Sequence, residues 1–164
     1  MPWQPECEDS FDQAEPKYKL RYFDRTTGSY VLLHRGRNRG ESFESELFIA
    51  ETFAKDGSIV ILLDESDGRE GKRPDAEIDG EIWDFKRLTP EAIAFANRVQ
   101  ADIREARNQG AVKAAYHIDR ENYDLNEIKR GTARAFRYDV EKQLQLVVYL
   151  LPTGERVFYG RNIL

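Results

Sequence analysis

The sequence has little of what several classes of functional site require. Its single cysteine, Cys7, excludes an internal disulfide and any zinc site built from several cysteines. Its two histidines, His34 and His117, leave little room for a histidine-rich metal centre. The longest apolar runs, such as Leu146–Leu151, are far too short to span a membrane. The N-terminus has no secretory signal pattern, so the composition predicts a cytoplasmic protein without a membrane partner.

The sequence also lacks an excess of positive charge. Charged residues make up 34% of the 164 positions, and the net charge is −5. Proteins that coat nucleic acid without specificity are usually basic, so the acidic balance favours either a local basic groove or a role away from nucleic acid. A nuclease is not excluded, because acidic metal ligands count toward the net charge until an ion is bound.

The periodicity of apolar residues predicts an α/β protein. Residues 1–16 are acidic and contain three prolines, which indicates a flexible arm, and residues 17–164 are enough for a single domain. Hydrophobic patterns and turn signals predict the following elements in order: strands Tyr18–Phe23 and Ser29–His34, helix Ser42–Lys55, strand Ser58–Asp64, a hairpin within Arg73–Lys86, a helix from Thr89 to about Asn108, strand Ala111–Ile118, helix Leu125–Tyr138, and a hairpin of Leu144–Leu151 and Arg156–Tyr159.

The hairpin carries an unusual pattern of charge. Asp79-Gly80 is a two-residue turn signal, and a turn there places Asp75 opposite Asp84. Opposed residues share a face, so Lys86 joins these two acids while the other face is mostly apolar. Two like charges at directly opposed positions are unfavourable. A divalent cation with oxygen ligands would compensate them.

A third acid lies in the preceding helix. Glu46 falls within an apolar stripe formed by Phe43, Leu47, Ala50, Phe53 and Ala54. A carboxylate on the inward face of a helix is costly unless it has a partner. Glu46 therefore either reaches water at the edge of the stripe or points at the same cation. Glu77, which shares the charged face of the hairpin, competes with it for that role.

Several polar side chains are candidates for contacting a polyanion. The loop His34–Gly40, HRGRNRG, is basic and contains glycine, and the helix Leu125–Tyr138 carries arginines at helical spacing. Each of these features is equally an ordinary solvated surface. The candidate substrate contacts are Arg35, Arg37, Arg39, Gln100, Arg130 and Arg134.

These residues carry a resemblance to a known superfamily. Pro74-Asp75, eight further residues and then Asp84-Phe85-Lys86 resemble the signature of the PD-(D/E)xK nucleases. The predicted order of elements resembles the αβββαβ restriction-endonuclease-like core, a mixed central sheet flanked by helices, here with an added C-terminal helix and β-hairpin. More narrowly, ELFIAETFAKDG, an apolar strand and PDAEIDGEIWDFK are similar to the C-terminal tRNA-nuclease domains of contact-dependent growth-inhibition toxins and related mobile-element nucleases.

The resemblance implies a divalent-metal-dependent endonuclease that hydrolyses phosphodiester bonds, in RNA such as tRNA rather than in DNA. It implies Mg²⁺ or Mn²⁺, with Zn²⁺ as an alternative. The implied ligands are Asp75, Asp84, the backbone carbonyl of Phe85 and Glu46, and Lys86 would lie near the attacking water. It also implies an inhibitory immunity protein as a partner and delivery into the cytoplasm of a target cell.

Two other functions remain open from the sequence. One is a non-catalytic binding or immunity-type module that retains the nuclease fold. The other is a metal-independent ribonuclease with His34 or His117 as the general base, since a histidine titrates near neutral pH. The retention of Asp75, Asp84 and Lys86 favours the enzyme over the binding module, and the place of His117 in a predicted strand, with no second histidine near it in sequence, disfavours the histidine alternative.

Overall fold

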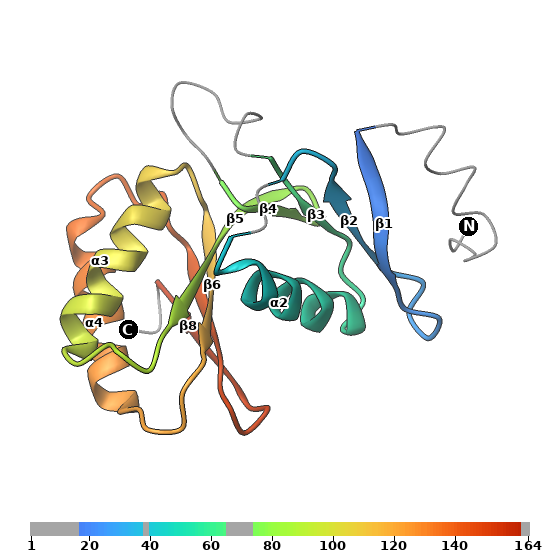
Figure 1. Ribbon diagram of the computed structural model, residues 1–164. Coiled ribbons are helices and arrows are strands. Elements are labelled where there is room, and N and C mark those ends of the chain that lie inside the picture. Colours follow the sequence, from blue (N-terminus) through green and yellow to red (C-terminus); the bar gives the residue numbers. More distant parts are fainter. Residues whose placement is uncertain (1–16, 38–39, 65–73, 162–164) are drawn as a thin grey trace. The chain divides into compact units, whose positions relative to one another are not determined.

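The computed structural model describes the chain in three stretches, residues 17–37, 40–64 and 74–161 (Figure 1). The predicted arm and two residues of the sequence analysis, Arg39 and Arg73, lie outside the described residues. The chain divides into two compact units, Met1–Glu81 and Ile82–Leu164, each of which is described by itself. The single domain expected over residues 17–164 stays a prediction.

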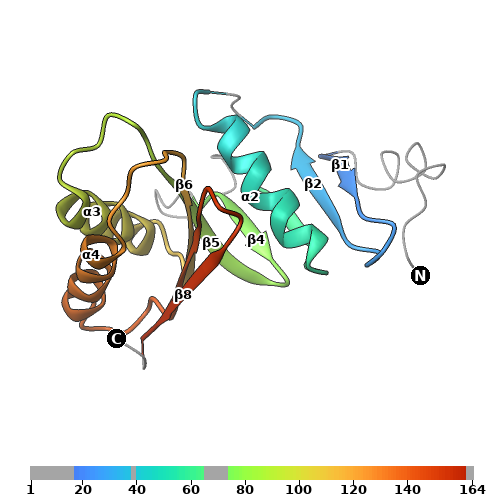
Figure 2. The same ribbon diagram turned by 90° about the horizontal axis from the view of Figure 1, so that it is seen from below.

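The described residues of the first unit form a mixed sheet of four strands and a helix. β1 (Tyr18–Phe23) pairs antiparallel with β2 (Tyr30–His34), and β2 pairs parallel with β3 (Val60–Leu62). The helix α2 (Phe43–Lys55) supplies the crossover that a parallel pair requires, and Figure 2 shows it running beside β2. β4 (Ala76–Ile78) pairs antiparallel with β3.

One face of this sheet forms the core of the first unit. Its side chains are at most 3% exposed and occupy matching positions on three strands: Val31, Leu33, Val60, Leu62, Ala76 and Ile78. Ile61 and Glu77 pair on the opposite face and are half-buried. The apolar run Ser58–Asp64 predicts a strand buried on both faces, whereas the structure buries it fully on one face only.

The predicted tight turn at Asp79-Gly80 is confirmed. Both residues have positive φ, 49° and 85°, the combination that a type I′ turn requires. The Oδ1 atom of Asp79 accepts a hydrogen bond from the Ile59 amide at 2.9 Å, and the Asp79 amide donates to the Ile59 carbonyl at 3.0 Å. These bonds fix the turn that leads into β5 (Glu81–Leu88).

The second unit continues with parallel strands. β5 pairs parallel with β6 (Lys113–Ile118), and β6 pairs parallel with β7 (Leu146–Leu150). The helices α3 (Phe95–Asn108) and α4 (Leu125–Tyr138) supply the two crossovers and lie side by side on one face of this sheet (Figure 1). β8 (Arg156–Gly160) pairs antiparallel with β7 and completes the predicted C-terminal hairpin. The mixed α/β class and the order helix, strand, hairpin, helix, strand are therefore confirmed.

The helix-covered face of the second unit holds a buried core. Its members come from both helices and from alternate positions of the strands: Leu88, Val99, Ile103, Ala114, Tyr116, Ile118, Ile128, Phe136, Val147 and Tyr149. On β5, Asp84 lies in register with Ala114 and Lys86 with Tyr116. Because Ala114 and Tyr116 belong to this core, the aspartate and the lysine of the D-x-K motif point to the helix-covered face.

The predicted start of the second helix is wrong. Thr89-Pro90-Glu91 has the composition of a helix N-terminus, but α3 begins at Phe95. The Ala92 amide donates instead to the Thr89 carbonyl at 3.2 Å, which makes a turn, and the Arg120 guanidinium donates to the carbonyls of both residues. Proline suits the second position of such a turn as well as it suits the first turn of a helix. None of the helices in the described stretches is long and apolar enough to cross a bilayer.

The contact between α3 and α4 leaves no room for a side chain at Gly131. An added Cβ would lie 3.1 Å from two backbone atoms of Ala96 and closer still to its carbonyl oxygen. We expect Gly131→Ala to destabilise the protein by about 2 kcal/mol, because the clash exceeds the gain in helix propensity. Thermal denaturation followed by circular dichroism would measure this. Arg137→Ala on the exposed face of α4 is the control, and an unchanged midpoint for Gly131→Ala would contradict the close packing.

Candidate functional site

The first group of charged residues surrounds a buried arginine. The Arg37 side chain is 7% exposed, and its Nη2 atom lies 2.9 Å from Oε2 of Glu46 and 3.6 Å from Oδ1 of Asp75. Its Nη1 atom donates to the backbone carbonyls of Leu63 and Asp75, the second at 2.9 Å. One guanidinium therefore connects the loop before α2, the helix itself and the ends of β3 and β4.

Glu46 is turned inward and does not lie in water at the edge of the apolar stripe. Its side chain is 13% exposed and accepts a hydrogen bond from the Ser42 hydroxyl at 3.1 Å. Ser42, a serine at the N-cap position of α2, has the residue type of a helix cap, but its hydroxyl caps no backbone amide and binds the carboxylate instead. Burial raises the pKa of Glu46, and the charge and hydrogen bonds of Arg37 oppose that rise. Glu46 is thus a buried acid that depends on one cation.

The second group lies on β5 and α3. The Lys86 ammonium is 3.0 Å from Oδ2 of Asp84 and 3.4 Å from Oε1 of Glu105. The Asp84 side chain is 3% exposed and that of Lys86 is 15% exposed, whereas Glu105 is open to solvent. Removing two charges from water is costly, so this buried pair is weak evidence for stability, and its place on a strand makes it a candidate for a functional site.

The predicted site residues thus fall into two groups. Glu46 and Asp75 meet around Arg37 in the first unit, and Asp84 and Lys86 form an ion pair in the second. Glu77, the competitor for the third acidic role, is not among the acids that Arg37 contacts. In the part of the chain that the structure describes, no three His, Cys, Asp or Glu side chains are grouped closely enough to hold a metal ion.

The candidate substrate contacts lie in different surroundings. Arg35 is exposed, Arg37 is internal as described above, and Arg39 falls outside the described residues. On α4, Arg130 is exposed and binds Glu127 at 3.1 Å. The two remaining candidates are Arg134, half-buried on α4, and Gln100, which lines a pocket between α3 and α4.

Sequence reasoning missed two buried carboxylates of the second unit. Asp102 is 7% exposed and accepts hydrogen bonds from the Tyr116 hydroxyl and from Nε of Arg98, at 3.1 Å. It lies among Val99, Ile103 and Ala106 on the buried side of α3, so the criterion applied to Glu46 would have found it. Asp139 follows α4 and is 4% exposed, and its ion-pair partners, Arg107 and Arg161, are so distant in sequence that no local pattern indicates them.

The two histidines of the metal-independent alternative lie in different units. Burial lowers the pKa of His117, with the Asp119 carboxylate opposing that effect and Arg87 adding to it. His34 lies in the other unit, where its Nδ1 atom accepts a hydrogen bond from the Gly36 amide at 3.0 Å.

Comparison with known proteins gives a family and a fold. The family model described as the contact-dependent growth inhibition CdiA C-terminal domain matches residues 72–156, just over half of the chain. One solved structure, titled a CdiA-CT/CdiI toxin and immunity complex from Burkholderia pseudomallei, matches with a TM-score of 0.56 and 16% identity, over 80% of this chain and 98% of that one. At this identity the likeness shows the fold alone. No curated protein matches. The extent of the family match places the chain in the CdiA C-terminal domain family of contact-dependent growth inhibition.

Proposed function

We propose that the protein is a divalent-metal-dependent endonuclease of the PD-(D/E)xK type, which hydrolyses phosphodiester bonds in RNA and most specifically in tRNA. The observation that carries the proposal is the buried Asp84–Lys86 ion pair, with 3.0 Å between Oδ2 and Nζ. These two residues are the D-x-K half of the signature, and they share one face of a strand. The family match includes both of them and Asp75.

The carboxylates at the predicted positions suit a hard divalent cation. Carboxylate oxygens are the ligands that Mg²⁺ and Mn²⁺ prefer, with Zn²⁺ as the alternative. Each carboxylate already lies beside a positive charge, Glu46 and Asp75 beside Arg37 and Asp84 beside Lys86. The proposed ligands are those that the resemblance implies, these three acids and the carbonyl of Phe85, although the described residues show no three such side chains already grouped for a metal. When bound, the metal would activate a water and neutralise charge on the phosphate.

The protein's own groups would contribute the remaining chemistry. Lys86 would hold its ammonium beside the reacting phosphate, where it orients the attacking water and stabilises the charge that develops on the phosphate oxygens. Asp84 keeps that ammonium in place, and Glu105 holds it from the helix side. Arg37 would keep Glu46 ionised, because the guanidinium offsets the effect of burial on the pKa of that acid.

The family match also supports a biological role for the activity. Members of this family are C-terminal domains of CdiA, and the matching solved structure is a complex of a toxin with its immunity protein. We therefore extend the proposal to a toxin domain that is delivered into a target cell and is blocked there by an immunity protein. The core would be restriction-endonuclease-like, with α4, β7 and β8 as additions to it.

A cleavage assay distinguishes this proposal from its alternatives. Purified protein is incubated with tRNA, single-stranded RNA and DNA, each with Mg²⁺, with Mn²⁺ and with EDTA. We expect cleavage of tRNA that requires metal and stops in EDTA. Cleavage that persists in EDTA would support histidine catalysis instead. Absence of cleavage of every substrate, together with no heat of metal binding in calorimetry, would favour a binding module that only retains the fold.

A further inference from the structure

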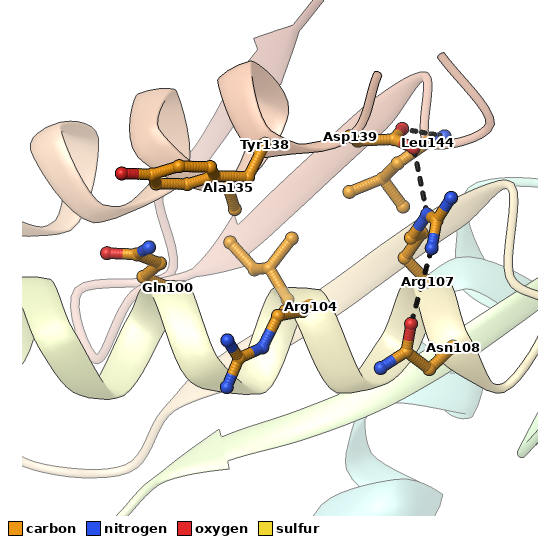
Figure 3. Close-up of a pocket in the computed structure, with 9 residues that line it drawn as sticks. Gln100, Arg104, Arg107, Asn108, Ala135, Tyr138, Asp139 and Leu144 are labelled. Atoms are coloured by element: carbon orange, nitrogen blue, oxygen red, sulfur yellow. Dashed lines mark hydrogen bonds and ion pairs between the residues drawn. The ribbon is translucent and has the colours of Figure 1, made fainter. Parts of the chain in front are cut away.

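A pocket of about 420 Å³ lies between α3 and α4 in the second unit (Figure 3). Its floor is apolar, formed by Ile103, Ala135 and Leu144, which are at most 6% exposed. The Tyr138 side chain, 69% exposed, extends along the α4 wall. Figure 3 shows Gln100 opposite it on α3 and the Arg104 side chain lying along α3. An apolar pocket of this size with a few polar groups at its rim is typical of a small-ligand site.

The polar groups of the α3 wall are arranged along one line. Gln100, Arg104 and Asn108 are four residues apart, so their side chains lie above one another on the helix. Arg104 is exposed and, within the described stretches, forms no ion pair or hydrogen bond. A guanidinium without an internal partner, placed between two amides, is suited to bind an anion while the amides bind hydrogen-bonding groups on either side.

The deep end of the pocket carries no net negative charge to repel an anion. The buried carboxylate of Asp139 binds Nε of Arg107 at 2.9 Å, the Leu144 amide at 2.8 Å and the guanidinium of Arg161. Burial would raise the pKa of Asp139, but its hydrogen bonds with Leu144 and Arg107 and the charge of Arg161 hold the pKa below its ordinary value. Arg107 also binds the exposed Glu141 at 3.1 Å. With these charges paired, Arg104 makes the pocket cationic.

We propose that this pocket binds one nucleotide of a single-stranded RNA segment, an inference that rests on the proposed nuclease function. The base would stack on the Tyr138 ring above the apolar floor, and the amides of Gln100 and Asn108 would bind its polar edge. The adjoining phosphate would bind Arg104. Stacking on an aromatic ring combined with a cation for the backbone is the usual chemistry by which proteins hold single strands.

The pocket lies close to the residues that carry the proposed reaction. Arg104 directly precedes Glu105, whose carboxylate binds Lys86 at 3.4 Å. The two side chains leave α3 in different directions, so the pocket and the lysine are separated by about the width of one helix, about 10 Å. A nucleotide near the cleaved bond can therefore reach the pocket, which would position the substrate strand relative to Lys86.

The test measures binding without cleavage, using fluorescence anisotropy of a labelled single-stranded RNA oligonucleotide in EDTA. Tyr138→Ala should weaken binding about tenfold, and Tyr138→Trp should retain it, because stacking on an aromatic ring is worth about 1–3 kcal/mol. Arg104→Gln should lower the slope of log K against log salt by about 0.7, the value for one phosphate contact on a single strand. Lys129→Ala, which removes an exposed cation elsewhere on α4, is the control and should leave the affinity nearly unchanged.

The outcomes separate this proposal from the nuclease proposal. If Tyr138→Ala and Arg104→Gln bind as the unaltered protein does, the pocket is not an RNA site, even where tRNA is still cleaved. If RNA does not bind at all, the pocket proposal also fails. The nuclease proposal is judged separately by cleavage with Mg²⁺. If neither the unaltered protein nor the variants cleave RNA, but the variants show the expected losses of binding, the nuclease proposal is rejected and the RNA-binding pocket remains.

Discussion

Lys86→Met and Asp84→Asn should each lower the rate of tRNA cleavage by about 10³-fold or more. The first change removes the ammonium that stabilises charge on the phosphate, and the second removes an anionic oxygen ligand. Both substitutions approximate the original shape, which matters because the Asp84 side chain is only 3% exposed. Cleavage rates at saturating Mg²⁺ measure the effect, and calorimetric titration with Mn²⁺ should show weaker metal binding by Asp84→Asn than by Lys86→Met.

A matched control lies on the same strand. Arg87 binds Asp119 at 2.7 Å, and alternation along β5 points it away from the face that holds Lys86. Arg87→Gln therefore breaks an ion pair of β5 without touching the proposed site and should leave the rate nearly unchanged. Normal cleavage by both site variants would show that the nuclease assignment of these residues is wrong.

Local signals in the sequence predicted much of the fold. Asp79-Gly80 determines its turn through the backbone preferences of those two residues, and no distant part of the chain is needed. The bounds of α4, Leu125–Tyr138, were also predictable, since Asp124 caps the first turn by accepting from the Asn126 and Glu127 amides. The helix start predicted at Thr89-Pro90 was wrong because this residue pair suits a turn as well as the first turn of a helix. Arg120, distant in sequence, selects the turn.

The sequence indicated which acidic side chains to examine, but it did not indicate which cations would pair with them. The position of Glu46 within an apolar stripe left two possibilities, an edge position in water or an inward carboxylate with a partner, and the structure shows it inward beside Arg37. The partner was not predictable, because the basic loop around Arg37 has the composition of a solvated connector. Only tertiary structure brings the Leu63 and Asp75 carbonyls to that guanidinium. Sequence patterns reveal which side chains need a counter-charge, whereas the choice of counter-charge depends on contacts between distant segments.

Arg37→Gln should destabilise the protein by about 3 kcal/mol, because it leaves Glu46 and Asp75 without the cation that lies between them. Burial already raises the pKa of Glu46, and loss of Arg37 should raise it further. A raised pKa in an acid means that the folded state binds the proton more tightly than the unfolded state, so stability falls as the pH rises. The variant should therefore recover part of its stability as the pH is lowered and Glu46 becomes neutral.

The same variant tests whether these two acids accept a metal. If a divalent cation binds them, Mn²⁺ should raise the midpoint of thermal unfolding more in Arg37→Gln than in the unaltered protein, since an ion that binds the folded state stabilises it. The double variant R37Q/E46Q removes both charges and should be more stable than Arg37→Gln alone at neutral pH, without the gain from Mn²⁺. Arg25→Gln, in the exposed turn of the same unit, is the control. It should change neither the stability nor the rise of the unfolding midpoint in Mn²⁺. An Arg37→Gln midpoint that Mn²⁺ does not raise would remove Glu46 and Asp75 from the proposed ligands.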